Sequence, residues 1–204
     1  MFASLKQTWN RRGLNDENYA WMFEPYSGDE VVVFDTETTG LNTKKDAVLS
    51  IGAVKVKGDR ILTSESFEIF LKPDKEISVE SIKIHHIRPC DLENGIEPQE
   101  GAKKFLDFIG NRPLVGYYLE FDMAMMNRLI KPWLGVTLPN KQIEVSGLYF
   151  DKKIALIPQG NIDLRFDTIL RDLKIPRMGQ HNALNDALMT AMVYIKLKNT
   201  LKLH

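Results

Sequence analysis

The sequence feature that most constrains the fold of this chain is a short apolar run that leads directly into acidic residues. Residues 31–33 are three valines, which predict a buried strand, and residues 34–41 continue as Phe-Asp-Thr-Glu-Thr-Thr-Gly-Leu. Side chains two residues apart share one face of a strand, so Asp35 and Glu37 project together near its end. The sequence therefore predicts two carboxylates at one edge of a buried sheet, where they can bind a divalent cation.

Two later segments favour a shared site over two solvated acids at a strand end. Residues 115–122 read Val-Gly-Tyr-Tyr-Leu-Glu-Phe-Asp, which indicates a second apolar strand whose end delivers Asp122. Residues 181–187 read His-Asn-Ala-Leu-Asn-Asp-Ala and supply His181 and Asp186. Taken alone, Asp186 is typical of a helix start and His181 of a surface loop. Their occurrence together with the strand acids indicates a metal-binding or catalytic site.

The strand and helix patterns predict an α/β fold. Strand signals at 31–37, 48–56 and 60–71, the last two joined by a tight Lys-Gly-Asp turn, predict three antiparallel strands. Helical and strand patterns then alternate, which predicts a mixed five-stranded sheet flanked by helices. The later elements are expected as helix 98–110, strand 114–118, helix 123–130, a weaker strand at 143–145, and helices 164–173 and 183–201.

The length of 204 residues favours one main domain. We expect residues 1–28 to form an added helical extension and residues 29–204 to form the main domain. The aromatic residues of the extension include Trp9, Tyr19 and Trp21. They are expected to pack on the main domain rather than bind a partner.

The charge balance and the cysteine content limit the binding partners and the cellular compartment that this chain can have. The 27 basic residues balance the 27 acidic ones, so any binding of nucleic acid must be local. Cys90 is the only cysteine, which excludes an intramolecular disulfide and a thiol-based zinc site. No apolar run is long enough to span a bilayer. We expect a cytoplasmic protein with no membrane partner.

The four predicted site acids are Asp35, Glu37, Asp122 and Asp186. Such hard oxygen ligands suit Mg²⁺ or Mn²⁺ rather than zinc. Acids that repel one another can hold two divalent cations, about 4 Å apart in sites that clamp both oxygens of a phosphoryl transfer. A histidine beside them can take the proton of the attacking water.

The three motifs, in this order and with these separations, resemble the DEDDh 3′-5′ exonucleases, the family that includes the proofreading epsilon subunits of bacterial DNA polymerase III and their stand-alone relatives. The likeness runs from about Val31 to Leu197. It implies a ribonuclease H-like fold and release of nucleoside 5′-monophosphates from a 3′ end. It also implies metal ligation by the four acids, with His181 as general base, because His181 stands five residues before Asp186 as in the histidine branch.

The resemblance also implies where a terminal nucleotide would bind. The turn after the first motif holds it in the family, and here Gly40 allows close backbone approach while Leu41 packs either on a base or in the core. His85 corresponds to a histidine near the substrate. The expected contacts are Thr38, Thr39, Gly40, Leu41, His85 and Phe121.

The chain departs from the family pattern in two segments. Tyr117 and Tyr118 stand where many relatives have His-Asn, and these aromatics either stack on a base or fill the core. His86 replaces a usual glycine.

The leading interpretation is a 3′-5′ exonuclease that acts on single-stranded ends of DNA or RNA, with a DNA polymerase as a possible partner. The alternative is a nuclease-like scaffold for such a partner, with the N-terminal aromatics and residues 132–134 (Pro-Trp-Leu) as contacts. A third possibility, an internal-cutting enzyme of ribonuclease H type, is disfavoured because such a site usually lacks the histidine-before-aspartate segment.

Overall fold

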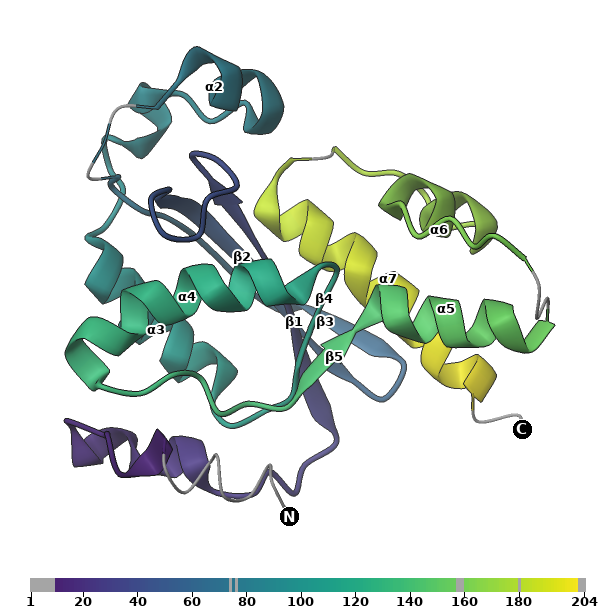
Figure 1. Ribbon diagram of the computed structural model, residues 1–204, viewed down its shortest axis with the longest axis horizontal. Coiled ribbons are helices and arrows are strands. Elements are labelled where there is room, and N and C mark those ends of the chain that lie inside the picture. The colour runs from purple at the N-terminus through teal and green to yellow at the C-terminus, as the bar shows by residue number, and fades with distance from the viewer. Residues whose placement is uncertain (1–9, 74, 76, 157–159, 180, 202–204) are drawn as a thin grey trace.

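A central five-stranded sheet organises the molecule, with strand order β3-β2-β1-β4-β5 (Figure 1). The computed structural model describes residues 10–73, 75, 77–156, 160–179 and 181–201. The first three strands pair antiparallel, whereas β4 pairs parallel with β1, and β5 pairs parallel with β4. This arrangement confirms the predicted sheet. The strands are β1 (Glu30–Thr38), β2 (Val48–Lys57), β3 (Arg60–Phe70), β4 (Leu114–Gly116) and β5 (Gln142–Glu144).

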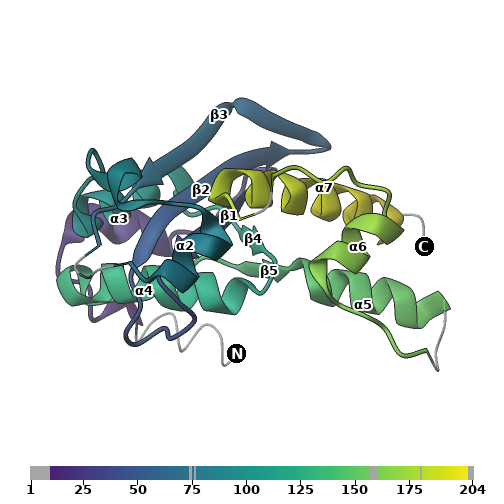
Figure 2. The same ribbon diagram turned by 90° about the horizontal axis from the view of Figure 1, so that it is seen from above.

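Helices cover both faces of this sheet (Figure 2). Among the described residues, no helix is long and apolar enough to cross a bilayer. In chain order the helices are the 3₁₀ helix η1 (Glu17–Phe23), α2 (Val79–His85), the 3₁₀ helix η2 (Pro89–Leu92), α3 (Pro98–Ile109), α4 (Leu119–Leu134), α5 (Val145–Leu156), α6 (Phe166–Asp172) and α7 (Ala183–Leu201).

Alternate side chains of β1 serve two separate hydrophobic cores. Val32 and Phe34 pack with residues of α3 and α4. Val31 and Val33 pack with residues of α5, α6 and α7. Because side chains alternate along a strand, Asp35 continues the row that faces α7. The two acids of β1 therefore stand on the α7 side of the sheet.

The N-terminal segment packs beneath the sheet, against α4. Met22 is buried, and the ring of Tyr19 meets Trp133 edge-on at 5.3 Å between centroids. The backbone N–H of Asn15 donates to the carbonyl of Leu134 at 2.9 Å. In Figure 1 this segment lies at the opposite end of the molecule from α2 and the start of α7. The expected packing holds for the described aromatics, while Trp9 lies outside the described residues.

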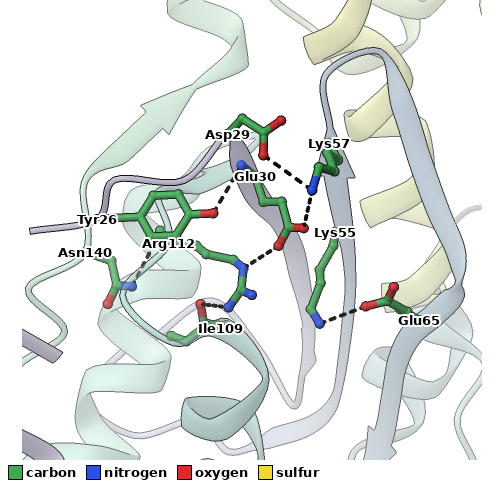
Figure 3. A network of polar contacts seen from close by, with 9 residues as sticks. All are labelled: Tyr26, Asp29, Glu30, Lys55, Lys57, Glu65, Ile109, Arg112 and Asn140. Atoms are coloured by element: carbon green, nitrogen blue, oxygen red, sulfur yellow. Dashed lines mark hydrogen bonds and ion pairs between the residues drawn. The ribbon is translucent and has the colours of Figure 1, made fainter. Parts of the chain in front are cut away.

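Polar contacts fix the start of β1 where the N-terminal segment joins it (Figure 3). The Tyr26 hydroxyl accepts from the backbone N–H of Glu30 at 3.1 Å. The Glu30 carboxylate accepts from Nε of Arg112 at 2.9 Å and lies 3.7 Å from the ammonium of Lys57. Arg112 precedes β4, so this network ties three neighbouring strands together at the end remote from the acids.

The structure corrects several predicted elements. Strand 114–118 ends at Gly116 because Tyr118 adopts a left-handed conformation, with φ 53°. Helix α4 therefore begins at Leu119, and the prediction that Asp122 lies at a strand end was wrong, because it lies in the first turn of α4. The predicted helix at 164–173 is shorter, at Phe166–Asp172, and helices α2 and α5 were not predicted. Helix α2 has only seven residues, and α5 follows β5 without an intervening turn.

Candidate active site

Two acids lie at the carboxyl end of β1, on the α7 face of the sheet. Asp35 pairs with Gly52 of β2, and Glu37 pairs with Ser50. Glu37 is buried and Asp35 is half-buried. Strand β1 thus presents both carboxylates to the space beside the start of α7.

Helix α4 brings a third acid to the same strand. Asp122 is buried, and its Oδ1 accepts from the Thr36 backbone N–H at 3.0 Å and from the Thr36 hydroxyl at 2.6 Å. Thr36 stands between Asp35 and Glu37 in the chain, so these two bonds fix α4 to β1 at the site. Both bonds are accepted by Oδ1, so Oδ2 of Asp122 makes no hydrogen bond to Thr36.

A glycine in β2 admits the first turn of α7, which carries the fourth acid. A Cβ at Gly52 would stand 2.1 Å from the backbone N of Leu184 and 2.2 Å from the carbonyl carbon of Ala183. The helix backbone therefore rests directly on β2 at the partner of Asp35. This contact places Asp186, in the first turn of α7, next to the strand acids.

His181 lies just before α7 and reaches the same point. Its backbone is left-handed, with φ 58°, and its N–H donates to Oδ2 of Asp186 at 3.0 Å. One potential ligand atom from each of Glu37, His181 and Asp186 lies within 4.8 Å of the others. The structure therefore brings together three of the five residues that the sequence assigned to catalysis, with Asp35 and Asp122 immediately beside them.

Burial and mutual repulsion disfavour the charged forms of these acids. Burial, followed by the charges of Asp186 and Asp122, raises the pKa of Glu37 to about 8. Burial also raises the pKa of Asp122 to about 7, although the bonds from Thr36 oppose this effect. The pKa of Asp35 lies well above its usual range, first through burial and then through its three carboxylate neighbours. Burial raises the pKa of Asp186, whereas the bond from the backbone of His181 opposes it.

The donor set fits a divalent cation. Oδ1 of Asp186 is buried and has no hydrogen-bond partner among the described residues. A buried acceptor without a partner is costly unless a donor or a cation satisfies it. Carboxylate oxygens with one imidazole suit Mg²⁺ or Mn²⁺, and a bound cation removes the repulsion that raises the pKa values. The residues present therefore fit the predicted metal site.

The turn after β1 is held by its own side chains. The hydroxyl of Thr38 donates to the carbonyl of Gly40 at 2.8 Å, and the hydroxyl of Thr39 accepts from the N–H of Ala47 at 2.9 Å. A Cβ at Gly40 would stand 2.6 Å from Oδ2 of Asp46, so glycine allows the turn to close on that side chain. Leu41 is 87% exposed, which removes the alternative that it packs in the core.

His85 is buried beside the site and both of its ring nitrogens are engaged. Nδ1 accepts from the N–H of Ile87 at 3.0 Å, so Nε2 carries the proton and meets the Ser81 hydroxyl at 2.6 Å. The Ser81 hydroxyl lies 3.5 Å from the carbonyl of Thr38 and so links α2 to the end of β1. Burial lowers the pKa of His85, which favours the neutral ring. His85 and His181 line one cavity of about 300 Å³.

The other predicted positions lie around the same edge. His86 ends α2 with φ 58°, a left-handed conformation that glycine adopts more readily than histidine. The Tyr117 hydroxyl donates to the carbonyl of Leu164 at 2.9 Å, and burial raises its pKa to about 12. Tyr118, at the start of α4, is 62% exposed, whereas Phe121 is half-buried. Tyr117 therefore packs against the core of α5, α6 and α7, whereas Tyr118 faces solvent.

Sequence reasoning missed two residues that assemble the site. Thr36 lies between the two acids, and a hydroxyl at that point was a signal for a polar partner on the opposite face of β1. Gly52 lies inside a strand, where glycine often marks a close approach of another backbone. Neither signal identifies the residue that makes the contact, because Asp122 and Leu184 are distant in the chain.

Sequence comparisons relate this chain to known proteins. A family model described as Exonuclease matches residues 32–194. The chain is 31% identical over 177 residues to a DNA polymerase III PolC-type from Caldanaerobacter subterraneus. The aligned region covers 85% of this chain and 12% of the relative. It is 28% identical over 166 residues to a DNA polymerase III subunit epsilon from Aquifex aeolicus, which covers 81% of this chain and 79% of the relative.

A solved structure shares the fold. The structure of E. coli exonuclease I in complex with a dT13 oligonucleotide superposes with a TM-score of 0.70 at 16% identity, covering 84% of this chain and 41% of the other. The likeness confirms the predicted ribonuclease H-like fold. This chain thus spans about an eighth of the length of the PolC-type relative and less than half of the exonuclease I chain.

Proposed function

Because this chain belongs to the exonuclease family, to which residues 32–194 match, we propose that it is a metal-dependent 3′-5′ exonuclease that shortens single-stranded DNA. The observation that supports this most is the convergence of Glu37, His181 and Asp186 within 4.8 Å, with one oxygen of Asp186 buried and unpartnered among the described residues. Family membership agrees with the resemblance read from the three sequence motifs and with the prediction of a nuclease.

Asp35, Glu37, Asp122 and Asp186 would hold the metal, in the form of two Mg²⁺ or Mn²⁺ ions. When bound, such cations acidify a coordinated water and neutralise charge that develops on the phosphate. The chain itself supplies acids whose pKa values are already raised, so binding of cations and loss of protons are coupled. Thr36 and Gly52 position these acids by fixing α4 and α7 against the sheet.

His181 would act as the general base. It is exposed, precedes α7, and offers its ring at the same point as Glu37 and Asp186. The ring nitrogen would take the proton of the attacking water as the oxygen approaches phosphorus. The bond between the phosphorus and the 3′ oxygen of the preceding nucleotide would break, and that oxygen would take up a proton to become the 3′-hydroxyl of the shortened strand. The other product is a nucleoside 5′-monophosphate. The hydrogen bond from the His181 backbone to Asp186 keeps the loop against the site.

The terminal nucleotide would bind beside the turn after β1. Leu41 is exposed there and offers an apolar surface to a base, while Thr38, Thr39 and Gly40 form the turn next to Glu37. Phe121, one residue before Asp122, is a further proposed contact. His85 stays a proposed contact from the cavity that it shares with His181, although its ring already bonds to Ser81 and Ile87.

Single-stranded DNA is the proposed substrate because the relatives are named as DNA polymerase III proteins and the matched exonuclease I structure holds a dT13 oligonucleotide. RNA with a free 3′ end is the second substrate to test. A DNA polymerase is a proposed partner on the same grounds. A pure scaffold role has less support, since Trp133 packs against Tyr19 and Leu134 is buried, so part of the expected contact surface is covered.

A labelled-strand assay tests this function. Single-stranded DNA and a matched RNA, each labelled at the 5′ end, are incubated with the protein in Mn²⁺ or in EDTA, and the products are resolved to single nucleotides. We expect a ladder that shortens stepwise from the 3′ end only with metal, and faster on DNA. Asp186→Asn should lower the rate at least about 100-fold, because it removes the negative charge of a proposed metal ligand.

Two results would contradict the proposal. Cleavage that persists when the 3′ end is chemically blocked would indicate internal cutting. Equal turnover by Asp186→Asn would remove that residue from the site.

A further inference from the structure

A basic pocket lies where the β1–β2 turn meets the segment after β3, the start of α3 and helix α4. It has a volume of about 330 Å³ and is lined by the cations Lys44, Lys45, Lys75 and Arg128. The cations come from three separate parts of the chain, namely the turn, the segment after β3, and helix α4. We call these four side chains and the cavity between them the basic pocket.

Among the described residues, none of the four cations of the basic pocket forms an ion pair, since no carboxylate lies within 4.0 Å of their charged groups. The ammonium of Lys75 donates to the carbonyl of Lys45 at 2.7 Å, and the guanidinium of Arg128 donates to the carbonyl of Thr43 at 3.4 Å. Each bond uses one donor, and a guanidinium has five while an ammonium has three.

Those two bonds also shape the pocket. They hold the turn against α4 and against the segment after β3, so the lysines of the turn are gathered rather than spread over the surface. Val48 and Leu129 supply apolar lining. A solvated charged surface needs neither a cavity nor convergence of three segments. The arrangement instead suits an anion that accepts several charge-assisted hydrogen bonds at once.

The basic pocket adjoins the end of β1 that carries the site acids. Its wall includes Val48, which pairs with Thr38, the residue after Glu37. Val48 packs in the core of α3 and α4, whereas Asp35 and Glu37 stand on the α7 side, so a strand that reaches both sites crosses the end of the sheet at the turn after β1. The chain as a whole carries no net charge, so the gathering of four cations at this end of the sheet is a local feature.

We infer that the basic pocket binds a backbone phosphate of the substrate strand, on the 5′ side of the nucleotide that is removed. This inference rests on the proposed function and extends it. The acids with their cations would hold the reacting phosphate, while the basic pocket holds a phosphate further along the same strand. Phosphate contacts position a strand without reading its sequence, so the pocket would serve any base composition.

Binding without catalysis tests the inference independently of the proposed function. Fluorescently labelled dT oligomers of increasing length are titrated with the protein in EDTA and followed by anisotropy. The variant combines Lys44→Gln, Lys45→Gln and Arg128→Gln. The matched control combines Lys57→Gln, Arg60→Gln and Lys198→Gln, which removes three cations around the β2–β3 hairpin at the opposite end of the sheet.

The pocket variant should bind long oligomers about 10-fold more weakly than the wild type. The slope of log affinity against log salt should become shallower by about 0.7 for each phosphate that the variant no longer neutralises. The control should keep both values. Equal affinity of wild type and pocket variant, or an equal weakening in the control, would overturn the inference.

A small substrate separates failure of this inference from failure of the proposed function. The p-nitrophenyl ester of a nucleoside 5′-phosphate has no upstream phosphate, so the pocket variant should hydrolyse it at the wild-type rate in Mn²⁺. A reduction on this ester as large as the reduction on long DNA would overturn the inference by placing the three residues at the reacting end. Absence of ester and DNA hydrolysis by the wild type would contradict the proposed function alone, because the anisotropy result stands by itself.

Discussion

Glu37 shows that a single side chain of the site is unfavourable for folding when no cation is bound. Its pKa in an unfolded chain is near 4.5, and burial with two neighbouring carboxylates raises it to about 8 in the folded protein. Between these two values the folded state holds more protons than the unfolded state. Stability contributed by this group is therefore fully present below about pH 4.5 and is lost as pH rises toward 8.

Replacement of Glu37 by glutamine should stabilise the metal-free protein at alkaline pH. Glu37→Gln removes the charge that burial penalises, so the free energy of unfolding in EDTA should rise by on the order of 2 kcal/mol at pH 8. The difference should shrink toward zero near pH 4.5. Thermal melts across this pH range measure it, and Glu93→Gln, at an exposed position, is the control. A destabilised Glu37→Gln at pH 8 would contradict the stated origin of the raised pKa.

At the scale of elements, the site depends on how closely α7 approaches β2. The first turn of α7 sits where a side chain of β2 would otherwise be, because a Cβ at Gly52 would lie only 2.1 Å from the backbone N of Leu184. Backbone atoms cannot move aside as a flexible side chain can. The position of Asp186 is therefore set by the absence of one methyl group.

Gly52→Ala should displace the start of α7 and separate Asp186 from Glu37. We expect cleavage to fall at least about 100-fold, since displacement of a catalytic group by about 1 Å can cost that much. The free energy of unfolding should fall by about 1–3 kcal/mol, as for other overpacked sites. Nuclease assays and denaturant titrations measure the two effects.

Gly147→Ala is the matched control. Gly147 lies in α5, and a Cβ there would have its nearest neighbour at 4.0 Å. Alanine should raise stability by up to about 1 kcal/mol and leave cleavage unchanged, because alanine has the higher helix propensity. Full activity in Gly52→Ala would show that the helix relaxes without moving Asp186.

Prediction from sequence succeeded where the signal was local. The alternation at Asp35 and Glu37 identified a shared face, and the three antiparallel strands followed from a short turn between apolar runs. It failed where distant contacts decide the structure. Asp122 is held against β1 by Thr36, which lies 86 residues away, and the left-handed Tyr118 ends β4 so that the acid stands in a helix rather than at a strand end.

At the scale of the whole molecule, the N-terminal segment and the site lie at opposite ends of the sheet (Figure 1). Met22 of that segment is 3% exposed and belongs to the same core as Phe34 and Phe105. The segment therefore contributes to stability through a core that it shares with β1, α3 and α4, although the family match begins only at residue 32.

Met22→Ala should lower stability without altering the chemistry. Removal of a buried methionine side chain costs about 2–5 kcal/mol, so the melting temperature should fall by several degrees. Turnover measured well below the melting temperature should stay within about 2-fold of the wild type. A fall in turnover as large as that of Gly52→Ala would indicate that the segment acts on the site.

The order in which the ligands occur along the chain has a consequence for synthesis. Glu37 is made early, whereas Asp186 follows 149 residues later (186 − 37), and α7 docks only after it has been made. At about 5–20 residues per second, translation separates the two by roughly 7–30 s. A nascent chain in which α7 has not yet been made therefore lacks one acid of the proposed metal site, and docking of α7 completes that site.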